Sequence, residues 1–169
     1  MNISMPLLSV LLVLVTVIPF LILNYSGKGE AKMLRKKADS LKKEFNLKFN
    51  LEENWGNSFI GLDTECNTLV FLKVFDGVVA TEIIDLAAVD KSEIIKKDKV
   101  VRNAHGKEVV LEKLDLRIAF FDTGKPDKLL NFYDLEDVYL EDYELRRAEK
   151  WNAAIANTIV PSLHREQVA

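Results

Sequence analysis

Residues 58–86 read SFIGLDTECNTLVFLKVFDGVVATEIIDL, and this stretch decides the fold. Ser58–Asp63 and Thr68–Phe75 are two apolar runs joined by the four turn-forming residues 64–67. Asp76-Gly77 then follows, a dipeptide suited to the positive φ angles of a tight hairpin turn, and it precedes a third run at Val79–Leu86. The stretch therefore predicts an antiparallel meander of three strands.

Further strand patterns continue on the C-terminal side. Glu93–Val101 is a more polar candidate, Val109–Phe121 alternates apolar and polar residues, and Leu129–Leu135 is a last strand. Alternation of apolar and polar residues is typical of a strand with one face in contact with solvent. It predicts that the apolar set of side chains lies in the core. The predicted core residues of the sheet are Trp55, Leu116, Ile118 and Phe120, and the expected count is six or seven strands.

A helix pattern follows the strands. Asp142 is a suitable N-cap, and Pro161 is expected to stop the helix. Its apolar face is traced by Leu145, Ala148, Trp151, Ile155 and Ile159. We expect this helix to lay Trp151 and Ile155 over a curved sheet.

The N-terminal region is apolar. Residues 5–23 read MPLLSVLLVLVTVIPFLIL without a charge, and at about 1.5 Å per residue they extend roughly 28 Å as a helix, close to the hydrocarbon thickness of a bilayer. A cleaved signal peptide is the rival interpretation, but it needs a basic start and a shorter apolar core. The pattern predicts a single transmembrane helix that includes Met5, Leu7, Leu14, Pro19 and Leu23.

Charge is unevenly spread beyond this segment. Residues 28–48 carry eight basic and three acidic residues, whereas residues 49–169 carry fifteen basic and twenty-three acidic ones. Lys and Arg beside a membrane span favour the cytoplasmic side, so the expected location is the plasma (inner) membrane with a cytoplasmic C-terminal domain. An acidic domain surface argues against a nucleic-acid partner.

The basic segment itself has helical spacing. Leu34, Ala38, Leu41 and Phe45 form an apolar stripe in an expected juxtamembrane helix at residues 31–47. Lys36, Lys37, Lys42 and Lys43 surround that stripe and are candidates to contact anionic lipid headgroups. Two alternatives stay open, namely pairing of the stripe with a second copy of the chain and a solvated stalk.

Few residues suggest chemistry. Asp122-Thr123-Gly124 matches the tripeptide of aspartic proteases, but Lys125-Pro126 follows it, and a surface turn is the preferred interpretation. His105 and His164 have no metal-ligand spacing, and the lone cysteine, Cys66, has no cationic sequence neighbour that would activate it. The acidic run at residues 134–144 lacks the pattern of a calcium loop. We therefore predict no enzyme activity, no cofactor and no metal.

The layout resembles a known family. A meander of about seven strands closed by one helix carrying Ala148-Glu-Lys-Trp151 and Ile155 looks like the pleckstrin-homology-like (PH-like) fold of uncharacterised bacterial membrane-anchored proteins. The segment at Glu82–Leu86 and the turn at Asp122–Pro126 also resemble the corresponding segments of members of that group. The resemblance implies a bent antiparallel β-barrel capped by the C-terminal α-helix, used as a docking module. Its lipid-reading members carry Lys and Arg in the first hairpin, where this chain has residues 63–67, DTECN, so a protein partner is preferred.

Together these patterns predict an α+β chain in four parts: an anchor at residues 1–27, a basic helix at 28–50, a PH-like domain at 51–161 and a tail at 162–169. The expected function is a membrane-anchored, non-catalytic interaction module of unknown partner. The alternatives are a dimeric aspartyl hydrolase acting through Asp122 and an accessory subunit of a membrane complex.

Overall fold

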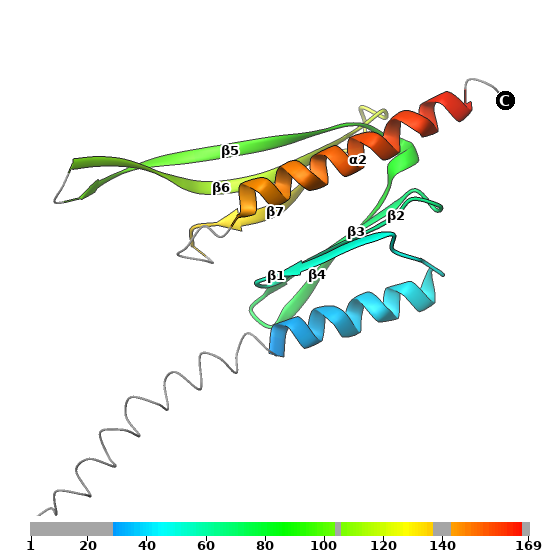
Figure 1. Ribbon diagram of the computed structural model, residues 1–169, viewed down its shortest axis with the longest axis horizontal. Helices are drawn as coiled ribbons and strands as arrows, with labels where there is room; N and C mark the ends of the chain where they lie inside the picture. The colour runs from blue at the N-terminus through cyan, green and yellow to red at the C-terminus, as the bar shows by residue number, and fades with distance from the viewer. Residues whose placement is uncertain (1–28, 104–105, 137–142, 167–169) are drawn as a thin grey trace, which may run out of the picture. The chain divides into compact units, whose positions relative to one another are not determined.

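The computed structural model describes residues 29–103, 106–136 and 143–166 of the 169-residue chain (Figure 1). These residues fall into two compact units. The first holds residues 29–61 and 70–82, and the second holds residues 62–69 together with the described residues from 83 onward.

The first unit is built from a helix at residues 29–44 and most of a four-stranded sheet. The strands are β1 (Leu51–Trp55), β2 (Ser58–Asp63), β3 (Thr68–Phe75) and β4 (Val78–Asp85), in the spatial order β1-β2-β3-β4. Asp76 and Gly77 both have positive φ angles, 48° and 76°, which suits the tight β3–β4 hairpin. The meander that the opening stretch predicts is therefore present, and β2 and β3 have the predicted bounds.

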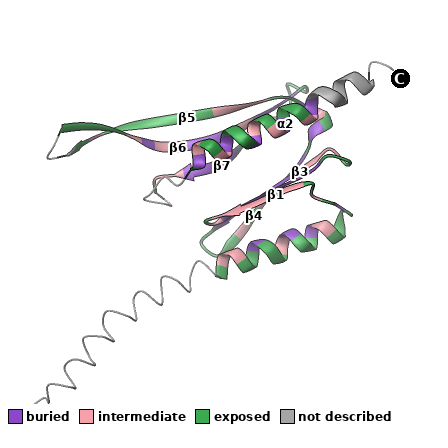
Figure 2. Ribbon diagram, in the orientation of Figure 1, coloured by how far each residue is buried: buried purple, intermediate pink, exposed green. Residues whose placement is uncertain are grey.

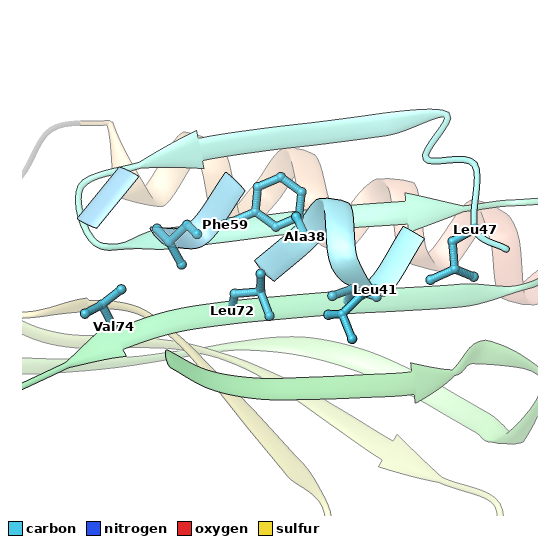
Figure 3. Packing of buried hydrophobic residues seen from close by; sticks show 8 residues of the cluster. Ala38, Leu41, Leu47, Phe59, Leu72 and Val74 are labelled. Atoms are coloured by element: carbon cyan, nitrogen blue, oxygen red, sulfur yellow. The ribbon is translucent and has the colours of Figure 1, made fainter. Parts of the chain in front are cut away.

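The core of the first unit lies between this helix and one face of the sheet (Figure 3). Ala38 and Leu41 come from the helix, and Phe59, Leu72 and Val74 from β2 and β3. The helical residues of the core, Leu34, Ala38 and Leu41, recur every three or four positions, which places them on one side of the helix. These three residues of the predicted apolar stripe are thus covered by the chain's own sheet, whereas the fourth, Phe45, is 48% exposed.

The second unit contains the sheet of β5 (Val89–Asn103), β6 (Gly106–Phe120) and β7 (Lys128–Asp134), in that order and antiparallel. A short 3-10 helix, η1 (Leu86–Ala88), precedes β5, and the Asp85 side chain caps it by accepting from the backbone N–H of Ala87 at 2.9 Å. Strands β5 and β6 pair from Val89↔Phe120 to Asn103↔Gly106.

Helix α2 (Glu144–Glu166) covers one face of this sheet and contacts β5, β6, β7 and η1. Its buried apolar residues are Ala148, Trp151, Ile155 and Ile159, spaced by three or four, as one apolar face requires. From β6, Leu116 and Ile118 are fully buried and Phe120 is 7% exposed. Ser92 on β5 donates to Asn152 Oδ1 on α2 at 2.7 Å, which identifies the helix-facing side of the sheet.

The predicted single bent barrel is wrong. Seven strands are present, but they form one sheet of four and one of three, without a ladder between the two sheets among the described strands. The prediction followed the strands in sequence and assumed that each would pair with the next. Instead, η1 separates β4 from β5, and β6 is the one strand in the described part of the chain that pairs with both β5 and β7.

The predicted membrane-spanning helix is not part of the described fold either. No helix among the described residues is long and apolar enough to cross a bilayer, because the helix at 29–44 and α2 both carry many charged side chains. The residues named for the span, Met5, Leu7, Leu14, Pro19 and Leu23, lie outside the described residues.

Two element boundaries also differ from prediction. Helix α2 does not end at Pro161 but continues to Glu166, and its predicted N-cap, Asp142, lies outside the described residues. The polar strand β1 was not predicted, although the predicted core residue Trp55 is its last residue. Trp55 is half-buried and packs on Phe71 with 6.3 Å between ring centroids.

Candidate functional site

A groove in the first unit is the strongest candidate site. It lies beside the helix at residues 29–44 and strand β1, and has a volume of about 650 Å³. Helix and strand both contribute to it because the core residues occupy one side of the helix and leave the next side facing β1. The lining residues are Arg35, Ala38, Asp39, Lys42, Glu52, Glu53, Asn54 and Phe59.

Strand β1 is an edge of the four-stranded sheet, since β2 is its only neighbour among the described strands. An edge strand presents backbone N–H and C=O groups that are not used in a ladder. The groove therefore combines two recognition elements, an unpaired strand edge and a wall of helical side chains. The described lining residues offer charged and amide groups that can bind a ligand, and none of them is a histidine, a cysteine or a hydroxyl-bearing residue.

Asn54 gives the groove a specific polar feature. Its Nδ2 atom is shielded from solvent and has no hydrogen-bond partner among the described residues. Leaving a shielded amide donor without a partner costs about 1–3 kcal/mol, so sequences usually avoid it unless another group satisfies the donor. A ligand carbonyl oxygen that displaced the side chains shielding this atom would satisfy the donor.

Lys42 closes one side of the groove. Its Nζ atom lies 2.6 Å from Glu52 Oε2 and 5.0 Å from the centroid of the Phe49 ring. Both charged side chains are partly exposed, and exposed pairs of this kind contribute only about 0–1 kcal/mol. A ligand can therefore displace Lys42 from Glu52 at little cost.

The structure places the lipid-contact candidates on the same helix but in different settings. Lys36 and Lys43 are exposed, Lys37 is half-buried, and Lys42 is the residue paired with Glu52. Phe45, predicted within the apolar stripe, is 48% exposed and lies outside the core. The four lysines therefore do not form one uniform cationic face.

Asp122 lies in an exposed turn after β6. Its Oδ1 atom accepts from the backbone N–H of Gly124 at 2.9 Å, and its carbonyl accepts from Lys125 at 3.0 Å. This is the hydrogen bonding of an ordinary Asx-type turn, which favours the turn interpretation of the DTG tripeptide.

Other sequence candidates are scattered. Cys66 is exposed in the β2–β3 turn, where Asp63 Oδ1 accepts from its backbone N–H at 2.9 Å. His105 and the side chain of His164 are outside the described residues, as is part of the acidic run at 137–142. The described residues contain no group of three His, Cys, Asp or Glu that could hold a metal ion.

Sequence reasoning missed the groove. The sequence patterns gave no role to Glu52, Glu53 or Asn54. The available signal was weak: Leu51, Glu53 and Trp55 alternate with Glu52 and Asn54, but five mostly polar residues do not make a clear strand pattern.

Comparison with protein-family models, curated proteins and solved structures finds no match for this chain. The resemblance to the PH-like group is thus untested by these comparisons, and the barrel that it implied is the one corrected above.

Proposed function

We propose that this chain is a non-catalytic interaction module that binds an extended peptide segment of a partner protein in the groove beside β1. The observation that carries the proposal is the open groove along an edge strand, with the unpartnered Asn54 amide in its lining. Extended peptides commonly add as a further strand to an exposed sheet edge, where main-chain hydrogen bonds supply affinity and side-chain pockets supply specificity.

The lining indicates what kind of segment fits. Two cationic residues, Arg35 and Lys42, and three acidic ones, Asp39, Glu52 and Glu53, favour a polar segment over an apolar one. The Asn54 amide would donate to one of its carbonyl groups. The predicted membrane location depends on residues outside the described ones and stays a prediction, which fractionation of cells would test.

The test begins with a random peptide library displayed on phage and selected against the full chain. Selected peptides are then titrated against the wild-type protein and the Asn54→Leu variant, which keeps side-chain size and removes the amide donor. We expect Asn54→Leu to weaken binding at least about tenfold, which corresponds to about 1.4 kcal/mol. Asn157→Leu is the matched control, because Asn157 is exposed on α2 and lies outside the groove.

Equal affinity of the selected peptides for wild type and Asn54→Leu would rule out binding in this groove. The same peptides, incubated with the protein and analysed by mass spectrometry, test the absence of catalysis. Cleavage that disappears on Asp122→Ala would support the aspartyl hydrolase instead.

A further inference from the structure

The second unit carries a projecting two-stranded ribbon. Strand β7 pairs with β6 only from Lys113 to Ile118, whereas β5 pairs with β6 along its whole length. Residues 98–103 of β5 and 106–112 of β6 therefore extend past the three-stranded sheet (Figure 1). Lys96 and Lys97 lie at the base of these segments, opposite Leu114 and Lys113. We call the projecting segments together with Lys96 and Lys97 the arm.

Apart from Leu111, which is buried, the arm adds little to the core of its own unit. Its β5 residues 96–100 are all exposed, and Figure 2 shows the far ends of both strands as exposed. Val100 and Val109 lie opposite each other in the register and are 61% and 66% exposed. Strands of 15 residues are well beyond the usual length of about 5–6, and an isolated two-stranded ribbon is marginally stable in water. Folding of the sheet alone thus gives no reason for this length.

The arm differs in charge from the rest of the domain. Residues 96–112 carry five basic and three acidic residues, a net charge of +2. Residues 49–169 carry fifteen basic and twenty-three acidic residues in all, so the part outside the arm has ten and twenty, a net charge of −10. The positive charge is concentrated on the β5 side, where Lys96, Lys97, Lys99 and Arg102 accompany one acidic residue, Asp98. Lys97 is paired with Glu112 of β6, so Lys96, Lys99 and Arg102 supply most of the charge offered to a partner.

Among the strands that the structure describes, β5 is also an edge of the three-stranded sheet. Lysines on an edge discourage pairing with another strand, because an incoming neutral or basic strand would face an unfavourable row of charges. Edge-to-edge pairing with a second copy would bring lysines close to lysines for the same reason. An acidic strand is the partner for which this charge becomes attractive.

We propose that the β5 edge of the arm, residues 96–103, binds an extended acidic segment of a partner protein by strand addition. Carboxylates of that segment lie against the basic residues of β5, and its alternate apolar side chains cover Val100. This site is on the second unit and is independent of the groove beside β1.

The probe is a synthetic ten-residue peptide of alternating Glu and Val, titrated against the full chain at low and physiological salt. A peptide of alternating Lys and Val, and a proline-interrupted peptide of the same acidity, are its controls. We expect binding of the acidic extended peptide only, with weaker binding at higher salt and slowed amide hydrogen exchange in residues 96–103.

The paired variant is Lys96→Glu with Lys99→Glu, which reverses two charges on the arm. Its matched control is Lys36→Glu with Lys43→Glu, the same charge change at exposed positions of the helix at 29–44. We expect the arm variant to lose at least about tenfold in affinity and the control to keep wild-type affinity. Circular dichroism checks that both variants are folded.

The proposal would be overturned by an equal loss of affinity in both variants or by protection from exchange that falls outside residues 96–103. Arm-dependent binding to phosphatidylglycerol vesicles without peptide binding would also overturn it. Concentration-dependent self-association through the arm would equally overturn it, in favour of a second copy. Loss of the groove peptides on Asn54→Leu with intact binding of the acidic peptide would separate the two sites.

Discussion

Gly61 on β2 lies against the ring of Phe49, which belongs to the segment between the helix at 29–44 and β1. A Cβ atom added at this position would lie 2.7 Å from carbon atoms of the Phe49 ring. The ring rests over the glycine and also packs on Phe59, with 5.9 Å between ring centroids. The absence of a side chain at Gly61 thus makes room for the Phe49 ring.

We therefore expect Gly61→Ala to destabilise the protein by about 1–3 kcal/mol, the usual cost of overpacking. Chemical denaturation monitored by circular dichroism measures the change. Gly29→Ala is the control, since a Cβ at Gly29 meets nothing within 4 Å. In a Phe49→Ala background the cost of Gly61→Ala should fall sharply; an unchanged cost would show that the ring is not the obstacle.

Glu112 and Lys97 form an ion pair at the base of the arm, with 2.8 Å between Oε2 and Nζ. The hydrogen bond from Lys97 lowers the pKa of Glu112 below its ordinary value of 4.5, and the same bond raises the pKa of Lys97. The carboxylate contribution is therefore present above the ordinary glutamate pKa and is lost as the pH falls through the lowered pKa.

Glu112→Gln should accordingly lower stability at neutral pH, and the difference from wild type should disappear as the pH falls from about 7 to about 3. Denaturation midpoints across this range measure the effect, with Glu149→Gln at an exposed position of α2 as the control. A difference that persists undiminished at the acidic end would contradict the assignment to the ionised pair.

At the scale of the element, α2 shows how one side chain anchors a helix on a sheet. Trp151 is the largest fully buried side chain, and it lies on the face that covers β5, β6 and β7. The predicted core residues Leu116, Ile118 and Ile155 are fully buried in the same unit. Removing the indole would leave a large cavity in this core.

Trp151→Ala should cost about 3–5 kcal/mol, the usual loss for a buried aromatic side chain. Thermal and urea denaturation measure it, and Glu149→Ala, two residues earlier on the exposed side, should change stability by less than about 0.5 kcal/mol. A loss at Trp151 no larger than the control would show that α2 is not needed for the second unit to stay folded.

Sequence patterns predicted these elements better than their pairing. The bounds of β2 and β3 could be predicted because two apolar runs are separated by turn residues, and Asp76-Gly77 marks the next hairpin. The division into two sheets could not, because period-two alternation says which face a residue occupies but not which strand lies beside it. Likewise, the stripe at Leu34, Ala38 and Leu41 predicted an amphipathic helix. It did not indicate that these residues pack against the chain's own sheet.

The candidate groove was even less accessible to sequence reasoning. It depends on Asn54 and Glu52 of β1 meeting Asp39 and Lys42 of the helix. Each is an ordinary polar residue in the sequence, and their shared location follows only from the packing of helix on sheet. The arm, by contrast, contains two predicted strands, but its projection follows from the short pairing of β7, which no pattern in β5 or β6 indicates.

At the scale of the whole molecule, the two units are linked through continuous strands. Gly61 of β2 belongs to the first unit and Leu62 to the second; β3 crosses between Leu69 and Val70, and β4 crosses between Glu82 and Ile83. The hydrogen bonds between strands form cooperatively along the ladder. When one half of such a strand unfolds, the free energy that keeps the other half ordered is therefore small.

We therefore expect the two units to unfold in one transition, despite their separate cores. Differential scanning calorimetry of the wild type should show a single peak whose calorimetric and van't Hoff enthalpies agree. Gly61→Ala in the first unit and Trp151→Ala in the second should each move that whole peak to lower temperature. Two peaks, of which each variant moves only one, would show instead that the strand crossings at 61/62, 69/70 and 82/83 act as hinges between independently folding units.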